Sequence, residues 1–367
     1  MRKKYYLCIF DDMKIVRKIL LVINLILIVG LLLTTIGGHV APSVTVLPGL
    51  LAYGYLPMLG LNVLMAVIWM LMGRWQCLLS VAAIAARYML IPLFFQIGGT
   101  SKIPSADEHP AMVKVMSYNV RLFRGAQQQP TSTDSNAIDF IGMVRQYNPD
   151  VLCLQEYAAP KTVRITDSLV LMGYNHYYGS HTAKTGLPYG TVIFSRMPIT
   201  YVNRIDGEKL LAEMMLDGRR FRICAIHMDS YRFDAADLDE IERVSHGDMS
   251  RGDGHTLDKV KETILCHEEE WNERIKPVVE ASTMPMLLAG DLNDIPNSWL
   301  YTQIAKQMKD CFCEKGMGYS NTYNGGFPRF RIDMVFHSEG WQTLSYRRIK
   351  TEISDHYPVL TSLELVP

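Results

Sequence analysis

The chain has 367 residues, of which 49% are hydrophobic and 20% are charged, and its 37 basic residues balance its 37 acidic residues. This composition excludes a disordered chain, which combines few apolar residues with a large net charge, and it excludes a strongly basic protein that binds polyanions through its overall charge. The balance hides two unlike parts. Residues 1–100 carry eight basic and two acidic residues, a charge of +6, which leaves 29 basic and 35 acidic residues, a charge of −6, in 101–367.

Three apolar stretches in the first 100 residues predict helices that cross a membrane. Residues 19–36 and 44–73 contain no charged residue, and 76–99 contains one, Arg87. Each stretch is long enough to cross a hydrocarbon core of about 30 Å. The first could also be a signal peptide, but its apolar core is long and no clear A-x-A cleavage site follows, which favours a retained helix. Arg87 leaves open whether the third stretch crosses or lies at the interface, since a charge at mid-bilayer costs about 2.5–3.5 kcal/mol.

The basic residues predict the orientation of these helices. Six of them precede the first stretch, none lies between 19 and 73, and Arg74 follows the second stretch. The positive-inside rule therefore places the N-terminus in the cytoplasm. Three crossings put residues 101–367 on the non-cytoplasmic side, whereas two would leave them inside. We expect three crossings, and hence an integral protein of the inner or plasma membrane that contacts the membrane through its N-terminal helices, with no protein partner indicated.

Residues 101–110 are polar, contain two prolines and are typical of a linker. The domain expected at 111–367 is long enough for a well-buried core. Its short apolar runs predict strands at 113–119, 151–155, 190–195, 221–227, 286–289, 332–337 and 359–363. Helices are expected at 135–147 and 257–279, and a surface loop at 229–255. This alternation predicts a mixed α/β domain.

Two groups of cysteines and acidic residues have ordinary explanations. Cys153 and Cys224 lie inside apolar strands and are expected to fill the core. Cys311 and Cys313 have no partner pair, so a zinc site is not expected there. The ligand-rich run 266–270 (CHEEE) is expected to be the solvated face of a helix, because its members point around the cylinder.

Several polar residues share one setting, at the end of an apolar strand, inside it or directly beside it. They are Asn119, Glu156, His227, Asp291, Asn293, Asp333, Asp355 and His356. Taken singly, each has an ordinary explanation, such as a turn or a satisfied core histidine. Together they are costly to desolvate unless cations or hydrogen-bond donors accompany them. Oxygen atoms of Asn, Asp and Glu are the ligands that Mg²⁺ prefers.

In chain order, the segments MSYNV, LQE, GTVIFSR, IH, GDLND, RIDMVF and SDHYPV resemble the endonuclease/exonuclease/phosphatase superfamily over about residues 111–367. The resemblance implies a four-layer α/β sandwich, in which helices flank two facing β-sheets, here preceded by an N-terminal transmembrane region. It also implies hydrolysis of a phosphate ester with Mg²⁺, or Mn²⁺ as a substitute. By the same resemblance, Glu156 is the principal metal ligand, helped by Asn119 and Asp355.

The resemblance assigns the remaining residues to the reaction itself. Asp291 would orient or deprotonate the attacking water, and Asn293 would hold the phosphoryl oxygens or the nucleophile. Asp333 and His356 would form an acid–imidazole pair that contacts the scissile phosphate. His227 would donate a hydrogen bond to the phosphate or assist the leaving group.

The sequence leaves the substrate open. The charge of −6 in 101–367 argues weakly against duplex DNA, which is bound largely through Lys and Arg. A local basic patch is conceivable near the site motifs, made of Arg329, Arg331, Arg347, Arg348 and Lys350. Membrane tethering favours a phosphoesterase that acts on a lipid head group or glycolipid. The alternatives are a membrane-tethered nuclease acting on DNA or RNA and, in another class, a catalytically silent receptor that binds phosphate groups. Arg121 stands where several nucleases of the family carry a metal-binding acid, which puts a second metal site in doubt.

Overall fold

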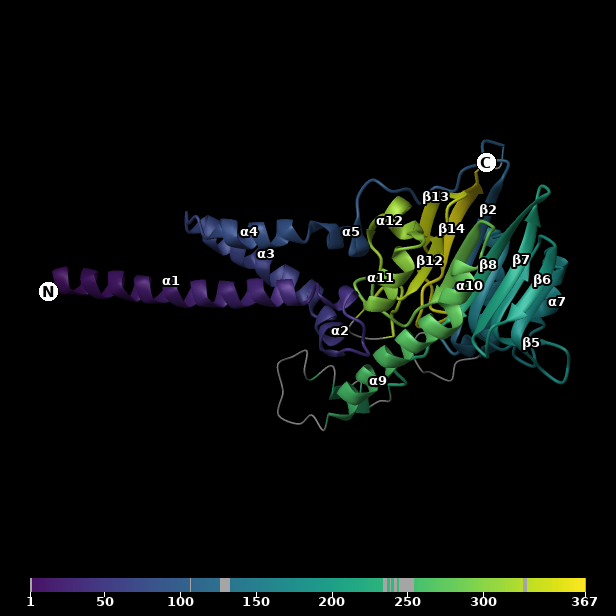
Figure 1. Cartoon of the computed structure of the whole chain (residues 1–367), viewed down its shortest axis with the longest axis horizontal. Coiled ribbons are helices and arrows are strands. Elements are labelled where there is room, and N and C mark those ends of the chain that lie inside the picture. The colour runs from purple at the N-terminus through teal and green to yellow at the C-terminus, as the bar shows by residue number, and fades with distance from the viewer. Residues whose placement is uncertain are drawn as a thin grey trace. The chain divides into compact units, whose positions relative to one another are not determined.

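The computed structural model describes residues 2–105, 107–125, 133–233, 236, 237, 239, 240, 243, 254–325 and 329–366, with side chains from residue 14 onward. The chain divides into two compact units (Figure 1). The first comprises Met1–Ile91 with Asn297–Trp299, and the second comprises Pro92–Pro296 with Leu300–Pro367. The domain limits expected from the sequence, 1–100, 101–110 and 111–367, stay a prediction.

The first unit is helical. Its elements are α1 (Arg2–Leu33), η1 (Gly37–His39), α2 (Leu47–Ala52), α3 (Tyr55–Leu71), α4 (Cys77–Ala86) and η2 (Tyr88–Leu90), with α5 (Ile91–Phe94) at the boundary. In the described part of the chain, one helical stretch, Lys14–His39, is long and apolar enough to cross a membrane unaided, and a signal sequence would meet the same criteria. Apolar side chains of α1 such as Ile19, Val22 and Ile26 are more than half exposed.

The second and third apolar stretches do not form long straight helices. Stretch 44–73 is broken between α2 and α3, and the 17 residues of α3 span only about 25 Å at 1.5 Å per residue. Stretch 76–99 bends by 55° between Cys77–Ala86 and Tyr88–Phe94, where Arg87 ends α4. The bent pair could cross as a single span, so three crossings and the orientation derived from them stay a prediction.

Buried polar side chains connect the helices of the first unit. Ser80 of α4 donates a hydrogen bond to Asn24 of α1 (2.6 Å), and Asn62 of α3 donates one to the carbonyl of Leu27 (2.9 Å). All three polar side chains are buried. Helices in an apolar surrounding associate through such hydrogen bonds and close packing, so these contacts favour one three-helix assembly of α1, α3 and α4.

The second unit contains two six-stranded mixed sheets (Figure 1). Sheet I has the order β10-β12-β9-β8-β7-β6. Its strands are β6 (Ile199–Arg204), β7 (Lys209–Leu216), β8 (Arg219–His227), β9 (Met286–Asp291), β10 (Lys309–Asp310) and β12 (Asp333–His337). Sheet II has the order β13-β14-β2-β3-β5-β4. Its strands are β2 (Met112–Asn119), β3 (Val151–Tyr157), β4 (His176–Thr182), β5 (Pro188–Ser195), β13 (Trp341–Arg348) and β14 (Val359–Leu365). A small third sheet pairs β1 (Phe95–Gln96) with β11 (Gly318–Tyr319).

Helices cover both outer faces of the paired sheets. They are η3 (Arg121–Phe123), α6 (Thr133–Tyr147), α7 (Ile165–Leu171), α9 (His255–Glu270), η4 (Trp271–Ile275), α10 (Lys276–Glu280), α11 (Trp299–Ala305) and α12 (Cys311–Lys315). On β2, Val113 and Val115 point into the core between the sheets, whereas Met116 and Tyr118 belong to the core shared with α6 and α7. Because both faces are buried, the central strands contain long runs of apolar residues. The expected four-layer α/β sandwich is therefore confirmed.

The strands that the sequence did not predict are mostly at the sheet edges. Each predicted strand is present to within a few residues, but β4, β6, β10 and β13, the four edges, were missed. Edge strands have one solvent-exposed side and carry polar residues, which weakens their apolar signal. The central strand β7 and the two short strands of the third sheet, β1 and β11, were also missed. Cys153 and Cys224 lie in the core as expected.

Two predictions about the segment after His227 need correction. The helix expected at 257–279 is three segments, because α9 passes through the π-turn η4 into α10, and Pro277 near the start of α10 has no backbone N–H to continue an α-helical ladder. The run 266–270 is not a solvated face: His267 is buried against Asp294, and Glu270 pairs with the buried Lys209. Much of the loop expected at 229–255 lies outside the described residues.

Candidate active site

Two pairs of parallel strands carry the polar residues to one end of the sandwich. In sheet II, β2 ends at Asn119 beside β3, which carries Glu156. In sheet I, β8 ends at His227, opposite Asp291 at the end of β9, and Asp333 of the antiparallel β12 pairs with the same Asp291. The two sheets therefore present acids and amides to each other across one end of the core.

Asn119 connects the two sheets. Its side-chain Nδ2 donates hydrogen bonds to Glu156 Oε1 (3.0 Å) and to Asp291 Oδ2 (3.1 Å). Its Oδ1 accepts a hydrogen bond from the backbone N–H of Arg121 (3.0 Å). The amide thus donates to the carboxylates, and its oxygen, which accepts one hydrogen bond from Arg121, keeps a second lone pair for a further contact.

Glu156 reaches the site through an irregularity in its strand. The pairing of β3 with β5 shifts register between Leu154 and Tyr157, and Glu156 has a φ of +48°. A bulge of this kind redirects a side chain that would otherwise alternate in or out of the sheet. The side chain of Glu156 is 38% exposed, so it is the acid through which solvent reaches the centre.

Asp291 is fixed by backbone contacts on both sides. Its Oδ1 accepts a hydrogen bond from the N–H of Asn293 (2.8 Å), whose Nδ2 in turn donates to the carbonyl of Met228 (2.9 Å). Gly290 precedes it because no side chain fits there: a Cβ atom would stand 1.8 Å from the carbonyl oxygen of Ile226. The fully buried Asp291 carboxylate therefore has little freedom to move.

His356 and Asp333 form a buried pair. Nδ1 of His356 lies 2.9 Å from Oδ2 of Asp333 and 3.8 Å from Oδ2 of Asp291. Thr322 Oγ1 accepts hydrogen bonds from the N–H groups of Asp333 and Ile332, which holds the acid in position. Burial alone would lower the pKa of His356, but the charges of Asp333 and Asp291 outweigh it and raise the pKa to about 10. The neighbouring carboxylates therefore favour the protonated imidazolium.

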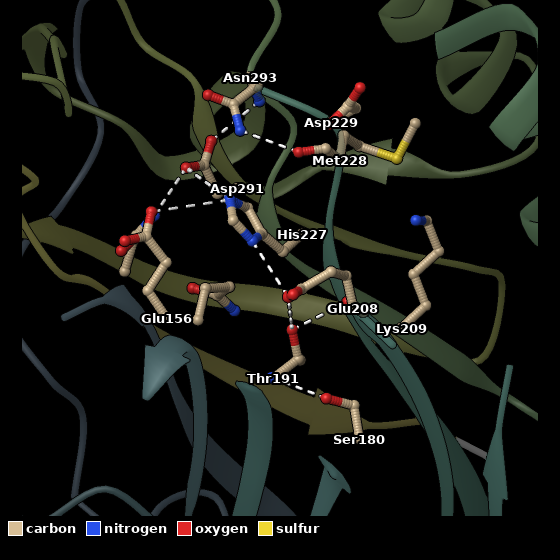
Figure 2. A network of polar contacts seen from close by, with 12 residues as sticks. Glu156, Ser180, Thr191, Glu208, Lys209, His227, Met228, Asp229, Asp291 and Asn293 are labelled. Atoms are coloured by element: carbon tan, nitrogen blue, oxygen red, sulfur yellow. Dashed lines mark hydrogen bonds and ion pairs between the residues drawn. The ribbon is translucent and has the colours of Figure 1, made fainter. Parts of the chain in front are cut away.

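His227 is held by an acid that the sequence did not single out (Figure 2). Its Nδ1 lies 3.2 Å from Oε2 of Glu208, while its Nε2 faces Glu156 Oε1 (3.9 Å) and Asp291 Oδ2 (4.0 Å). Thr191 Oγ1 donates to the carbonyl of Glu208 (2.8 Å) and lies 3.4 Å from its carboxylate. Burial lowers the pKa of His227, but the hydrogen bond to the carboxylate of Glu208 and the charges of Asp291 and Glu156 raise it overall.

Asp355 lies between two cations. Its Oδ2 is 3.1 Å from Nη1 of Arg121, and its Oδ1 is 4.0 Å from Nε2 of His356 and accepts a hydrogen bond from Ser354. Burial raises the pKa of Asp355, although His356 and Arg121 counteract it. All eight residues singled out in the sequence therefore occur in one connected network.

The charges of this network fit a divalent cation. The charged groups at the centre are Glu156, Asp291, Asp333, Asp355, Arg121 and His356. Four carboxylates and two cations leave an excess charge of −2, and one carboxylate oxygen, Oδ1 of Asp333, is buried with no hydrogen-bond partner among the described residues. Ligand atoms of Asp291, Asp333 and His356 lie within 4.8 Å of one another. Hard oxygen donors with this excess suit Mg²⁺ or Mn²⁺.

The basic patch considered from the sequence is not formed as expected. Arg331 is buried, its Nη2 lies 2.7 Å from Oδ2 of Asp310, and its guanidinium stands over the ring of Phe312. It therefore cannot contribute to a surface that binds nucleic acid. The sequence did not indicate this burial. Arg331 directly precedes β12, whose residues are all buried.

Several solved structures are similar to this chain at low sequence identity. An endonuclease/exonuclease/phosphatase from Beutenbergia cavernae matches with 19% identity and a TM-score of 0.47, covering 70% of this chain and 72% of that chain. The human Nocturnin catalytic domain with bound sulfate matches with 14% identity and a TM-score of 0.47 (70% and 95%). Truncated Caenorhabditis elegans TDP2 matches with 19% identity and a TM-score of 0.46 (70% and 99%).

Family models match both parts of the chain, whereas no curated protein matches it. Residues 17–94 match a domain of unknown function (DUF8431). Residues 116–241 and 272–356, more than half of the chain, match the endonuclease/exonuclease/phosphatase family. The chain therefore belongs to the endonuclease/exonuclease/phosphatase family, as its sequence motifs predicted.

Proposed function

We propose that the chain is a membrane-anchored, Mg²⁺-dependent phosphoesterase that hydrolyses a phosphodiester or phosphomonoester by in-line attack of water. Family membership supports hydrolysis of a phosphate ester. The observation that carries the proposal is the network in which Asn119 bridges Glu156 and Asp291 while His356, paired with Asp333, stands beside the same Asp291. Acids, an amide and an imidazolium at one point can both hold a cation and position a phosphate.

Glu156 would hold the metal ion, with Asp355 and Asn119 as further ligands. The bound ion would polarise the phosphate and offset the charge that develops on its oxygens. Glu156 suits this role because it is the most exposed of the four acids at the centre, and Asp355 because its pKa is raised partly by the charge of Glu156. Binding a cation between the two relieves that repulsion.

Asp291 would orient the attacking water and accept its proton. Its Oδ1 is occupied by the N–H of Asn293, so the second oxygen, which faces Asn119 and both histidines, remains for water. The side chain of Asn293 donates a hydrogen bond to the carbonyl of Met228. We therefore propose that the main role of Asn293 is to fix this turn, and that its contact with the phosphate is secondary.

The two histidines would act through their Nε2 atoms. Nδ1 of His356 is engaged by Asp333, which leaves the Nε2–H of the imidazolium free to donate to a phosphate oxygen. Nδ1 of His227 is engaged by Glu208, and its buried Nε2 has no hydrogen-bond partner among the described residues. An unpartnered donor aimed at the acids suits a hydrogen bond to the substrate or to the leaving group.

The N-terminal unit would anchor this site at a membrane, with the second unit on the non-cytoplasmic side. The exposed apolar side chains of α1 support membrane contact. Tethering at a bilayer favours a lipid head group or glycolipid as the substrate. A reporter fused after Pro367 that is active only in the cytoplasm would contradict the orientation.

The test is hydrolysis by the full chain in detergent, with Mg²⁺ or with EDTA. The panel is bis-p-nitrophenyl phosphate, sphingomyelin, phosphoinositides, plasmid DNA and RNA, so that head-group release and nucleotide release are distinguished. We expect Glu156→Gln and His356→Ala each to lower turnover by about 10²–10³. The matched controls are Glu280→Gln and His109→Ala. Glu280 is an exposed acid of α10, and His109 lies shortly before the start of β2, away from Asn119 at its end. Turnover of the two site variants at the level of these controls would refute the assignment.

A further inference from the structure

Arg121 is presented to the site by a strained turn. Directly after β2, Arg121, Leu122 and Phe123 have φ values of +45°, +51° and +61°. Consecutive left-handed residues other than glycine are unfavourable and persist only where the surroundings impose them. Here Phe123 is buried against Phe140 and Tyr157, and the N–H of Arg121 is held by Asn119. The turn fixes the direction of the Arg121 side chain.

The guanidinium of Arg121 is only partly used by the protein. Nη1 lies 3.1 Å from Asp355 Oδ2 and donates to the carbonyl of Gly125 (3.2 Å). A guanidinium has five N–H donors. Within the described part of the chain, no protein partner is present for its Nε or Nη2, and the side chain is 21% exposed. The remaining donors can therefore bind a ligand.

Arg121 and His356 flank the same carboxylate. Asp355 has Arg121 at one oxygen (3.1 Å) and Nε2 of His356 at the other (4.0 Å). The two cations that can bind an anion therefore lie next to one carboxylate, in the same part of the network. The planar fork of arginine matches two oxygens of a phosphate, which a lysine does not.

We propose that Arg121 is a substrate-binding residue that contacts a non-bridging oxygen of the phosphate being hydrolysed. The inference rests on the proposed function for the identity of that phosphate. It also predicts a single divalent ion per chain, because one such ion offsets the excess charge of −2 that remains once the charges of Arg121 and His356 are counted. Metal stoichiometry therefore tests the same assignment without turnover.

The experiment is isothermal titration of the full chain in detergent, first with Mn²⁺ and then with inorganic phosphate in the presence of Mg²⁺. Arg121→Gln and Arg121→Lys are compared with Arg124→Gln, which removes an exposed arginine of the same turn. We expect one Mn²⁺ per chain, phosphate binding weakened at least tenfold in Arg121→Gln, an intermediate loss in Arg121→Lys, and no change in Arg124→Gln. The Michaelis constant for bis-p-nitrophenyl phosphate should rise in parallel.

Two Mn²⁺ ions per chain, no phosphate binding by the wild-type chain, or a folded Arg121→Gln that binds phosphate like Arg124→Gln would each overturn the inference. If Arg121→Gln fails to fold, the test uses Arg121→Lys instead. A phosphate affinity of Arg121→Lys equal to that of Arg124→Gln would then overturn the inference. The proposed function fails separately, through unchanged turnover in Glu156→Gln and His356→Ala.

Discussion

Glu208→Gln tests whether the acid behind His227 contributes to the reaction. The substitution keeps the size of the side chain but removes the charge that faces Nδ1 of His227 at 3.2 Å. A hydrogen bond to a charged group contributes about 1.5–3 kcal/mol. The side chain of Glu208 is 48% exposed, so solvent screening places the effect at the lower end. About 1.5 kcal/mol corresponds to a roughly tenfold lower kcat/KM, because each tenfold in rate is about 1.4 kcal/mol.

The assay is a double-mutant cycle on Mg²⁺-dependent turnover. Glu208→Gln is measured in the wild-type chain and in His227→Ala, with Glu280→Gln as the control for removing an exposed glutamate. If Glu208 acts by orienting His227, its substitution has no further effect once the imidazole is gone. Thr191→Val, which removes the hydroxyl that contacts Glu208, should produce a smaller loss in the same direction. An undiminished tenfold loss in the His227→Ala background would refute the reasoning, as would a Glu208→Gln enzyme as fast as the wild type.

Two further outcomes follow from the same network. Mg²⁺ at about 100 times its Kd should stabilise the fold by about 2.7 kcal/mol. Thermal unfolding should show this as a higher Tm, and Glu156→Gln should abolish the increase. A Tm that is equal with Mg²⁺ and with EDTA would argue against a metal site. Thr322→Val leaves the N–H groups of Ile332 and Asp333 without their acceptor and should lower the free energy of unfolding by about 2–4 kcal/mol. A denaturant titration measures this loss, and Thr322→Ser, which keeps the hydroxyl, should restore most of it.

The sequence predicted the fold well because the central strands are buried on both faces. Runs such as 286–289 have no polar interruption, so their limits are set by the residues that end them. The polar residues that end these strands are also the residues of the candidate site. The fold and the site could therefore be predicted from the same pattern of apolar runs that end in polar residues. The edge strands could not be predicted, since a strand such as β6 (ITYVNR) has only a half-buried pattern of residues.

Details of the site depended on contacts that a linear pattern does not contain. Glu208 stands in a polar turn before β7, where an acid normally faces solvent, and only the pairing of β7 with β8 brings it beside His227. His267 was expected on a solvated helix face, yet it is buried. Its Nδ1 lies 3.4 Å from the carboxylate of Asp294, and its Nε2 lies 2.8 Å from the carbonyl oxygen of Asp229. In each case the partner is distant in sequence, and local charge gave no sign of it.

The position of the site at the meeting of two sheets explains how so many acids remain buried together. Asp291 and Asp333 are adjacent partners in sheet I, and burial together with the charge of Asp291 raises the pKa of Asp333, which the charge of His356 counteracts. His356 supplies a positive charge 2.9 Å from Asp333 and 4.0 Å from Asp355, and Arg121 contacts the same Asp355, whereas Glu156 of sheet II contacts neither of these two cations within the described residues. The uncompensated charge therefore lies on the side of Glu156, where the network opens to solvent. Under the proposed function, a cation entering there would be held by the acids before the phosphate binds, so phosphate binding should depend on the metal.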